Sequence, residues 1–185
     1  MSASETLRWL VTALDDAGIP YMIVGSFASS AHGAMRTTRD VDVVIDPSRE
    51  AFERFLSGID DDRYYIDRDV ARDAMRLRTM VNIIDSKTGW KVDLVIRKHL
   101  PHAVAEFERR VRGRILGVDV HLATAEDVIV AKLAWARAGG SDRQLDDVRG
   151  VLAAGGAQLD LAYVSSWAET LGLTELWERV RATSG

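Results

Sequence analysis

The sequence predicts a mixed α/β fold of the α+β class, in which a small mixed sheet with flanking helices is followed by a C-terminal helical bundle. Short apolar runs typical of buried strands occur before residue 122, interspersed with helical segments. From Thr124 onward, the apolar residues recur at helical spacing almost to the end of the chain. The length of 185 residues fits one domain, or one domain with a helical appendage.

The N-terminal part is predicted to alternate helices with strands. Leu7, Leu10 and Leu14 recur at helical spacing before Gly18, which predicts a first helix over 4–17. Turn residues bound the segments that follow. The other elements expected here are helices over 26–32 and 50–56, strands over 21–24, 41–45, 80–85 and 90–96, and within 115–122 either a short strand or a hairpin around Gly117.

The C-terminal part is predicted to be entirely helical. Glu126 and Asp127 lie in the first turn of the expected first helix, where the helix dipole favours acidic side chains. The expected helices cover 124–137, 142–153, 160–171 and 174–181. Because no long linker separates the two parts, we expect residues 123–185 to pack on a core formed by residues 1–122.

Composition excludes several classes of protein. The chain has no cysteine, which excludes a disulfide scaffold and a thiol nucleophile. Its formal charge of −4 argues against a strongly basic nucleic-acid coat, although it leaves room for a local basic patch. No apolar run reaches the roughly 18 residues of a membrane span, and the first residues lack the apolar segment of a secretory signal. We therefore expect a cytoplasmic protein with no membrane partner.

Asp40 and Asp42 are the first candidates for chemistry. Alternate residues of a strand point to the same face, so the two carboxylates should project side by side. Each then raises the pKa of the other, and a divalent cation relieves the repulsion. Carboxylate oxygens suit Mg²⁺, which takes waters and substrate phosphates as its remaining ligands. An isolated Asp-x-Asp is, however, most often a solvated strand edge.

Asp93 is the third acid of the candidate site. It interrupts the apolar strand over 90–96, where an unpaired charge is costly. If this strand lies beside that of Asp40 and Asp42, three carboxylates converge on one edge. Three carboxylates can hold two Mg²⁺ ions roughly 4 Å apart and align an attacking oxygen with a leaving pyrophosphate. Asp93 would also orient or deprotonate an acceptor hydroxyl.

Gly25 and Ser26 form a candidate phosphate-binding turn. A strand that ends in glycine, followed by a serine that opens a helix, presents backbone N–H groups and a hydroxyl to an anion. Arg36 and Arg39, just before the acids, are placed to neutralise the rest of a triphosphate. Without the acids, an ordinary strand-to-helix turn is the better explanation of Gly25-Ser26.

Taken together, Gly25-Ser26, Asp40-x-Asp42 and the later Asp93 resemble the nucleotidyltransferase superfamily with the polymerase-β-type fold. The helical part resembles the AbiEii-like branch of that superfamily through four short motifs, and the resemblance covers about residues 20–152. The motifs are Ala125-Glu126-Asp127, Lys132-Leu133-Ala134, Arg143-Gln144 and Asp147-Val148.

The resemblance also implies roles for two residues of the helical part. It implies that Lys132 contacts nucleotide phosphates and that Asp147 is an accessory residue of the active site. Two other interpretations stay open. Lys132 would be a surface lysine whose stem lies on apolar surface, and Asp147 would belong to an i, i+4 pair on one helix.

The function implied by the resemblance is metal-dependent transfer of a nucleoside monophosphate from an NTP to a hydroxyl acceptor, with release of pyrophosphate. Two Mg²⁺ ions are the implied cofactors. The acceptor stays open between RNA such as a tRNA end, a partner protein and a small molecule, and a toxin–antitoxin pair with a cognate partner is one implied setting. The alternative is a catalytically silent module that binds a nucleotide or a partner. The implied catalytic and metal ligands are Asp40, Asp42 and Asp93, and the nucleotide-binding residues are Gly25, Ser26, Arg39 and Lys132.

Overall fold

The computed structural model describes residues 3–34, 38–139 and 142–183. In these residues, one seven-stranded sheet has the strand order β3-β4-β5-β2-β1-β7-β6. Strands β2 and β5 are parallel, as are β1 and β7, and the other neighbours are antiparallel. The strands are β1 (Tyr21–Ile23), β2 (Asp40–Ile45), β3 (Tyr64–Tyr65), β4 (Met80–Asp85), β5 (Lys91–Ile96), β6 (Val111–Ile115) and β7 (Val118–Leu122).

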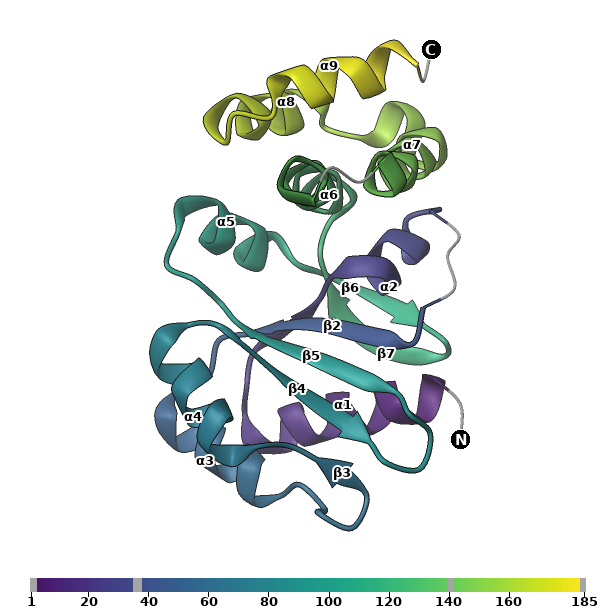
Figure 1. The fold of residues 1–185 in the computed structure, drawn as a ribbon. Coiled ribbons are helices and arrows are strands. Elements are labelled where there is room, and N and C mark those ends of the chain that lie inside the picture. Colours follow the sequence, from purple (N-terminus) through teal and green to yellow (C-terminus); the bar gives the residue numbers. More distant parts are fainter. Residues whose placement is uncertain (1–2, 35–37, 140–141, 184–185) are drawn as a thin grey trace.

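Helices cover both faces of the sheet (Figure 1). Up to the last strand, the helices are α1 (Ala3–Ala17), α2 (Gly25–Ala31), α3 (Arg49–Ser57), α4 (Arg68–Leu77) and α5 (Pro101–Arg109). After the last strand come α6 (Ala125–Gly139), α7 (Asp142–Gly155), the short 3₁₀ helix η1 (Gly156–Gln158), α8 (Leu161–Thr170) and α9 (Thr174–Ala182). In the described part of the chain, no helix is both long enough and apolar enough to span a bilayer.

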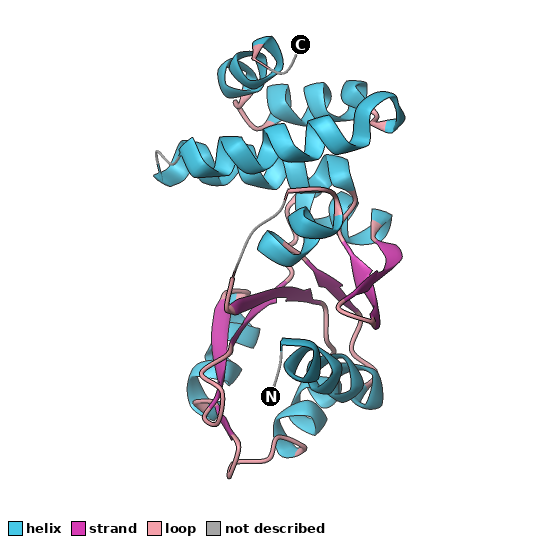
Figure 2. Cartoon of the chain, turned by 90° about the vertical axis from the view of Figure 1, so that its right-hand side faces the viewer, coloured by secondary structure: helices cyan, strands magenta, loops and turns pink. Residues whose placement is uncertain are grey.

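The sheet separates two apolar cores (Figure 2). On one side, α1, α3 and α4 pack against the face that carries Val41, Val43 and Leu94. On the other side, Val44 and Met22 join a core built from α2 and the helices α6 to α9. Burial of apolar surface in both cores therefore fixes which face of β2 and β5 looks toward the helices α6 to α9.

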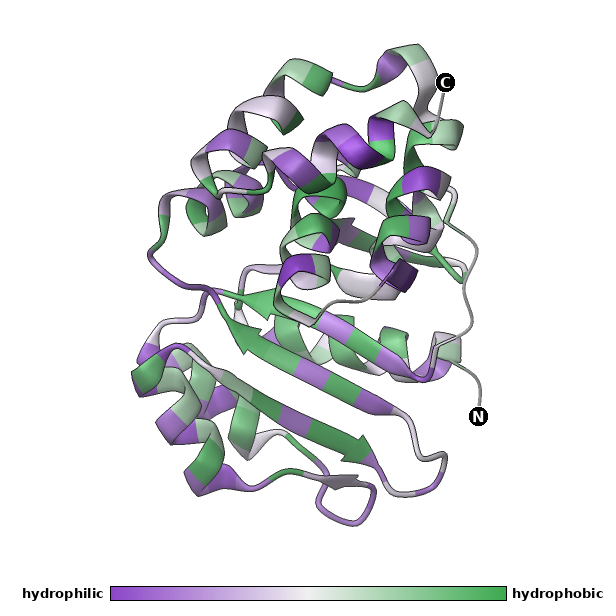
Figure 3. Ribbon diagram, turned by 45° about the horizontal axis from the view of Figure 1, so that its top comes forward, coloured by the Kyte–Doolittle hydropathy of each residue, from purple (hydrophilic) through white to green (hydrophobic). Residues whose placement is uncertain are grey.

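The polar residues of the central strands follow this division. Figure 3 shows hydrophilic and hydrophobic residues alternating along the strands below the helical layer. In β2 and β5, Val41, Val43, Val92 and Leu94 are buried, and the residues between them at the strand starts are polar and partly exposed. The polar side chains therefore gather where the two strands begin.

The α+β prediction is confirmed, although a sheet of seven strands is larger than the small sheet expected. The predicted strand over 80–85 has the observed bounds, and 111–122 forms the hairpin β6–β7, whose turn contains Leu116 and Gly117 at positive φ. The elements expected from the sequence did not include β3, α4 or α5. A strand of two residues has no recognisable period, and α5 has only Phe107 as a fully buried residue.

Candidate active site

The register of β2 and β5 brings the candidate acids together. Asp42 pairs with Asp93, and Asp40 pairs with Lys91. Directly paired residues of neighbouring strands project to the same face of a sheet. Asp40 has 49% of its side chain exposed and Asp93 14%, so Asp93 is the more deeply buried of these two acids. The side-by-side arrangement predicted for the three carboxylates is therefore present.

Gly25 lies directly against Asp42. It opens α2 with a φ of +61°, a conformation that favours glycine. A Cβ atom at this position would lie 2.0 Å from Oδ2 of Asp42, which leaves no room for a larger residue. The Val24 N–H donates to the Asp42 carbonyl over 2.9 Å and fixes this approach. The glycine thus lets the turn before α2 close over the acid.

The electrostatics of Asp42 reflect its crowded position. Burial is the main cause that raises the pKa of its carboxyl, and the negative charge of Asp93 raises it further. The Ser26 backbone N–H donates to this carboxyl and, with the more distant Lys132, acts in the opposite direction. The net shift of the Asp42 pKa is upward, because burial and the neighbouring carboxylates outweigh these two favourable interactions.

Two side chains hold Asp93 in place. The Asn82 amide on β4 donates to its Oδ1 over 2.5 Å, and Lys91 Nζ lies 3.1 Å from the same oxygen. Lys91 Nζ is also 3.8 Å from Oδ1 of Asp40. Burial lowers the pKa of Lys91, but its bond to Asp93 and the nearby carboxylates outweigh burial and raise it overall. The ammonium group is therefore charged and bridges two of the three acids.

Lys132 and Asp147 form a buried ion pair across α6 and α7. Lys132 Nζ lies 2.6 Å from Oδ2 of Asp147, and 6% and 10% of the two side chains are exposed. The interpretation of Lys132 as a surface lysine is therefore wrong, and Asp147 has an ion-pair partner on another helix. Lys132 is near enough to Asp42 to lower its pKa, which ties the helical layer to the carboxylates.

The structure places the other predicted phosphate ligands, Ser26 and Arg39, in the first turn of α2 and just before β2. Ser26 is buried in the first turn of α2, where its carbonyl accepts from the Ser29 hydroxyl over 3.1 Å. Arg39 is exposed just before β2, and its carbonyl accepts from the Lys91 N–H. Within the described residues, no hydrogen bond or ion pair joins the Arg39 guanidinium to the three carboxylates. Arg36 lies outside the residues that the structure describes.

Sequence analysis did not identify Lys91 or Asn82 as site residues. Lys91 stands two residues before Asp93, so strand alternation alone places both on one face. Asn82 is different, because its contact with Asp93 depends on the pairing of β4 with β5. That register is a long-range property, which the alternation within one strand does not reveal.

The residues present fit a divalent cation in chemistry, although they are not preassembled around one. Carboxylate oxygens on one face are hard ligands, and the raised pKa of Asp42 marks charge that a cation would neutralise. Among residues 3–34, 38–139 and 142–183, no three His, Asp or Glu side chains come together as ligands around one point. Lys91 lies between Asp40 and Asp93 in the arrangement observed.

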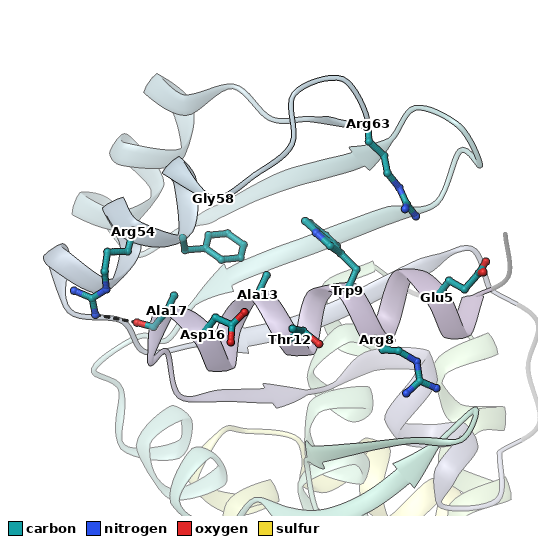
Figure 4. Close-up of a pocket in the computed structure, with 11 residues that line it drawn as sticks. Glu5, Arg8, Trp9, Thr12, Ala13, Asp16, Ala17, Arg54, Gly58 and Arg63 are labelled. Carbon is teal, nitrogen blue, oxygen red and sulfur yellow. Dashed lines mark hydrogen bonds between the residues drawn. The ribbon is translucent and has the colours of Figure 1, made fainter.

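A pocket of about 610 Å³ lies elsewhere, against α1 and α3 on the other side of the sheet (Figure 4). Trp9 and Ala13 of α1 point into it, and the Arg54 guanidinium donates to the Ala17 carbonyl over 2.9 Å at one end. None of the candidate site residues lines this pocket. Its position therefore does not connect it with the three carboxylates.

Comparison with solved structures identifies the fold. ANT(2″)-Ia in complex with adenylyl-2″-tobramycin has a TM-score of 0.60 at 16% identity, over 92% of this chain and 99% of that one. The lincosamide antibiotic adenylyltransferase LnuA, lincomycin-bound, has a TM-score of 0.53 at 10% identity, over 82% and 96% of the two chains. An antigenic nucleotidyltransferase-like protein from Paracoccidioides brasiliensis has a TM-score of 0.52 at 20% identity, over 80% and 72%.

No protein-family model matches the chain, and no curated protein sequence matches it. The predicted nucleotidyltransferase fold is nevertheless confirmed by the structural similarity. The AbiEii-like branch stays a prediction.

Proposed function

We propose that the protein is a metal-dependent nucleotidyltransferase that moves a nucleoside monophosphate from an NTP to a hydroxyl acceptor and releases pyrophosphate. The observation that carries this proposal is the pairing of Asp42 with Asp93, beside Asp40, on one face of the sheet. The nucleotidyltransferase fold supports it, because that fold is shared with two antibiotic-modifying proteins.

Each of the three acids has a role in this proposal. Asp40, Asp42 and Asp93 would hold the Mg²⁺ ions, which when bound supply charge neutralisation for the triphosphate. Asp93 would in addition orient the acceptor hydroxyl and take its proton. Its 14% exposure and its bond to Asn82 fit a carboxylate that is held in one orientation. Catalysis would then come from positioning and charge balance, because nucleotidyl transfer needs little covalent chemistry from the protein.

The triphosphate would lie over the turn before α2. Gly25 brings the backbone close to Asp42, and the Ser26 N–H that now donates to Asp42 would be available to a phosphate oxygen. Arg39 is exposed near the same end of β2 and would supply positive charge. Lys132, paired with Asp147, would act on the phosphates through its charge and not as an exposed ligand.

The acceptor is the least constrained part of the proposal. RNA, a protein and a small molecule all remain candidates. Two of the similar structures hold lincomycin and adenylyl-2″-tobramycin, which supports an antibiotic-like small molecule among these candidates. A toxin–antitoxin role and a cognate partner protein stay predictions.

The test is to incubate the protein with each α-³²P-labelled NTP and Mg²⁺ in the presence of RNA, a protein extract or a panel of hydroxylated small molecules. The proposal predicts label in one acceptor class with wild-type protein and none with the Asp42→Asn variant. Binding of NTP without any labelled product from these pools would support the alternative, a silent nucleotide-binding module. Equal labelling by wild type and Asp42→Asn would overturn the assignment of the site.

A further inference from the structure

Among the described residues, Lys91 is the cation that forms ion pairs with two of the three carboxylates, Asp40 and Asp93. Its Nζ atom is 3.1 Å from Asp93 and 3.8 Å from Asp40. Lys132 influences Asp42 from a greater distance, because its own ammonium group is bonded to Asp147. Asp40 and Asp93 are therefore balanced mainly by one flexible side chain.

The position of this ammonium group conflicts with that of a metal ion. A Mg²⁺ ion binds carboxylate oxygen at roughly 2.1 Å, so an ion on Oδ1 of Asp93 would lie within about 5 Å of an unmoved Lys91 Nζ. The two cations would repel each other and compete for the same oxygen. Lys91 has 37% of its side chain exposed, and a lysine stem is flexible, so the ammonium group has a solvated alternative position.

We propose that Lys91 is an internal counter-ion that holds Asp40 and Asp93 in the metal-free protein and is displaced when a divalent cation binds. This inference rests on the proposed function, because it requires that the three carboxylates bind a metal. It accounts for the finding that no three acidic or histidine side chains in the described residues are preassembled as metal ligands. Lys91 thereby determines the concentration of divalent cation at which the carboxylates bind it.

Displacement of Lys91 affects metal binding even when no substrate is turned over. Removal of the Lys91 charge takes away the competitor, so metal affinity increases. It also leaves the carboxylates of the metal-free protein less balanced, so that protein unfolds at a lower temperature. A role of Lys91 in packing alone would lower the unfolding temperature without a gain in metal affinity.

The experiment measures Mn²⁺ binding by isothermal titration calorimetry, without nucleotide, for wild type, Lys91→Met and Lys91→Arg. We expect Lys91→Met to bind Mn²⁺ about tenfold more tightly, which is within the usual range of coupling between two ligands. Lys91→Arg keeps the positive charge and is expected to show no such gain. The matched control is Lys87→Met, because Lys87 is exposed in the turn between β4 and β5 and is expected to bind as wild type does.

Thermal unfolding with and without Mn²⁺ provides a second measurement on the same proteins. The rise in unfolding temperature on addition of Mn²⁺ should be larger for Lys91→Met than for wild type. Mn²⁺ binding by Lys91→Met that is equal to or weaker than wild type would overturn this inference and leave the proposed function standing. Absence of Mn²⁺ binding by wild type and Lys91→Met alike would overturn both.

Discussion

Gly25 determines, at the scale of single residues, how close the turn before α2 comes to the acids. Its positive φ and its approach to Asp42 are separate constraints. Gly117 shares only the first, since it has a φ of +76° and no atom within 4 Å of an added Cβ. A comparison of substitutions at the two glycines therefore separates the free-energy cost of the backbone conformation from that of a collision with Asp42.

We expect Gly25→Ala to destabilise the protein more than Gly117→Ala does. An alanine at positive φ costs about 1 kcal/mol, and at Gly25 the collision with Asp42 adds to it. Urea unfolding of both variants gives the two free energies, and NTP labelling gives the accompanying loss of transfer. Equal destabilisation by the two substitutions would contradict the close contact between Gly25 and Asp42.

The pair Lys132–Asp147 makes a second prediction from single side chains. Lys132→Met removes the ammonium group from a buried carboxylate and should lower the free energy of unfolding by about 3 kcal/mol. The exposed Lys98→Met serves as the control and should have almost no effect. Chemical denaturation measures both, and a loss at Lys132 as small as that at Lys98 would indicate a solvated lysine.

At the scale of elements, the packing of helix α5 changes the pKa of one of its side chains, Glu106. Burial of Glu106 between α5 and α6, together with the charge of Asp127, raises the pKa of its carboxyl to about 8. Asp127 is itself fully buried and accepts from Tyr163 over 2.6 Å and from Thr124 over 2.7 Å. The protonated form of Glu106 is therefore the one that suits the folded protein at neutral pH.

The sign of the resulting pH dependence follows from this raised pKa. The folded protein keeps the Glu106 proton up to about pH 8, whereas the unfolded chain releases it near the ordinary glutamate pKa of 4.5. The free energy of unfolding contributed by Glu106 is present in full below pH 4.5. It falls as the pH rises from there to about 8, by up to about 1.4 kcal/mol per pH unit.

Glu106→Gln should therefore remove this fall in stability between the two pKa values. Unfolding free energies measured across the interval test it, with the exposed Glu108→Gln on the same helix as the control that keeps the wild-type slope. Identical pH profiles for wild type and Glu106→Gln would show that Glu106 ionises as freely in the folded protein as in the unfolded chain.

For the whole molecule, the arrangement of two cores around one sheet explains where the site lies. Val44 and Val95, further along β2 and β5, belong to the core that includes residues of α6 to α9, and the three carboxylates lie nearer the strand starts. A substrate therefore has access to the acids from solvent, while the apolar remainder of both strands stabilises their register.

Local sequence patterns predicted the parts of this arrangement that local rules determine. Strand alternation placed Asp40 beside Asp42, and helical spacing predicted most helices. The contacts of Asn82 with Asp93 and of Lys132 with Asp147 depend on which strands and helices become neighbours. Tertiary packing decides those neighbours, and no spacing within one segment of the sequence encodes them.

The most direct test of the central claim is pyrophosphate release from an NTP and its acceptor in the presence of Mg²⁺. It compares wild type, Asp42→Asn and Asp119→Asn, whose exposed carboxylate on β7 forms a surface ion pair with Arg114. We predict release by wild type and Asp119→Asn, and loss of release by Asp42→Asn at an unchanged unfolding temperature. Full release by a folded Asp42→Asn protein would contradict the account.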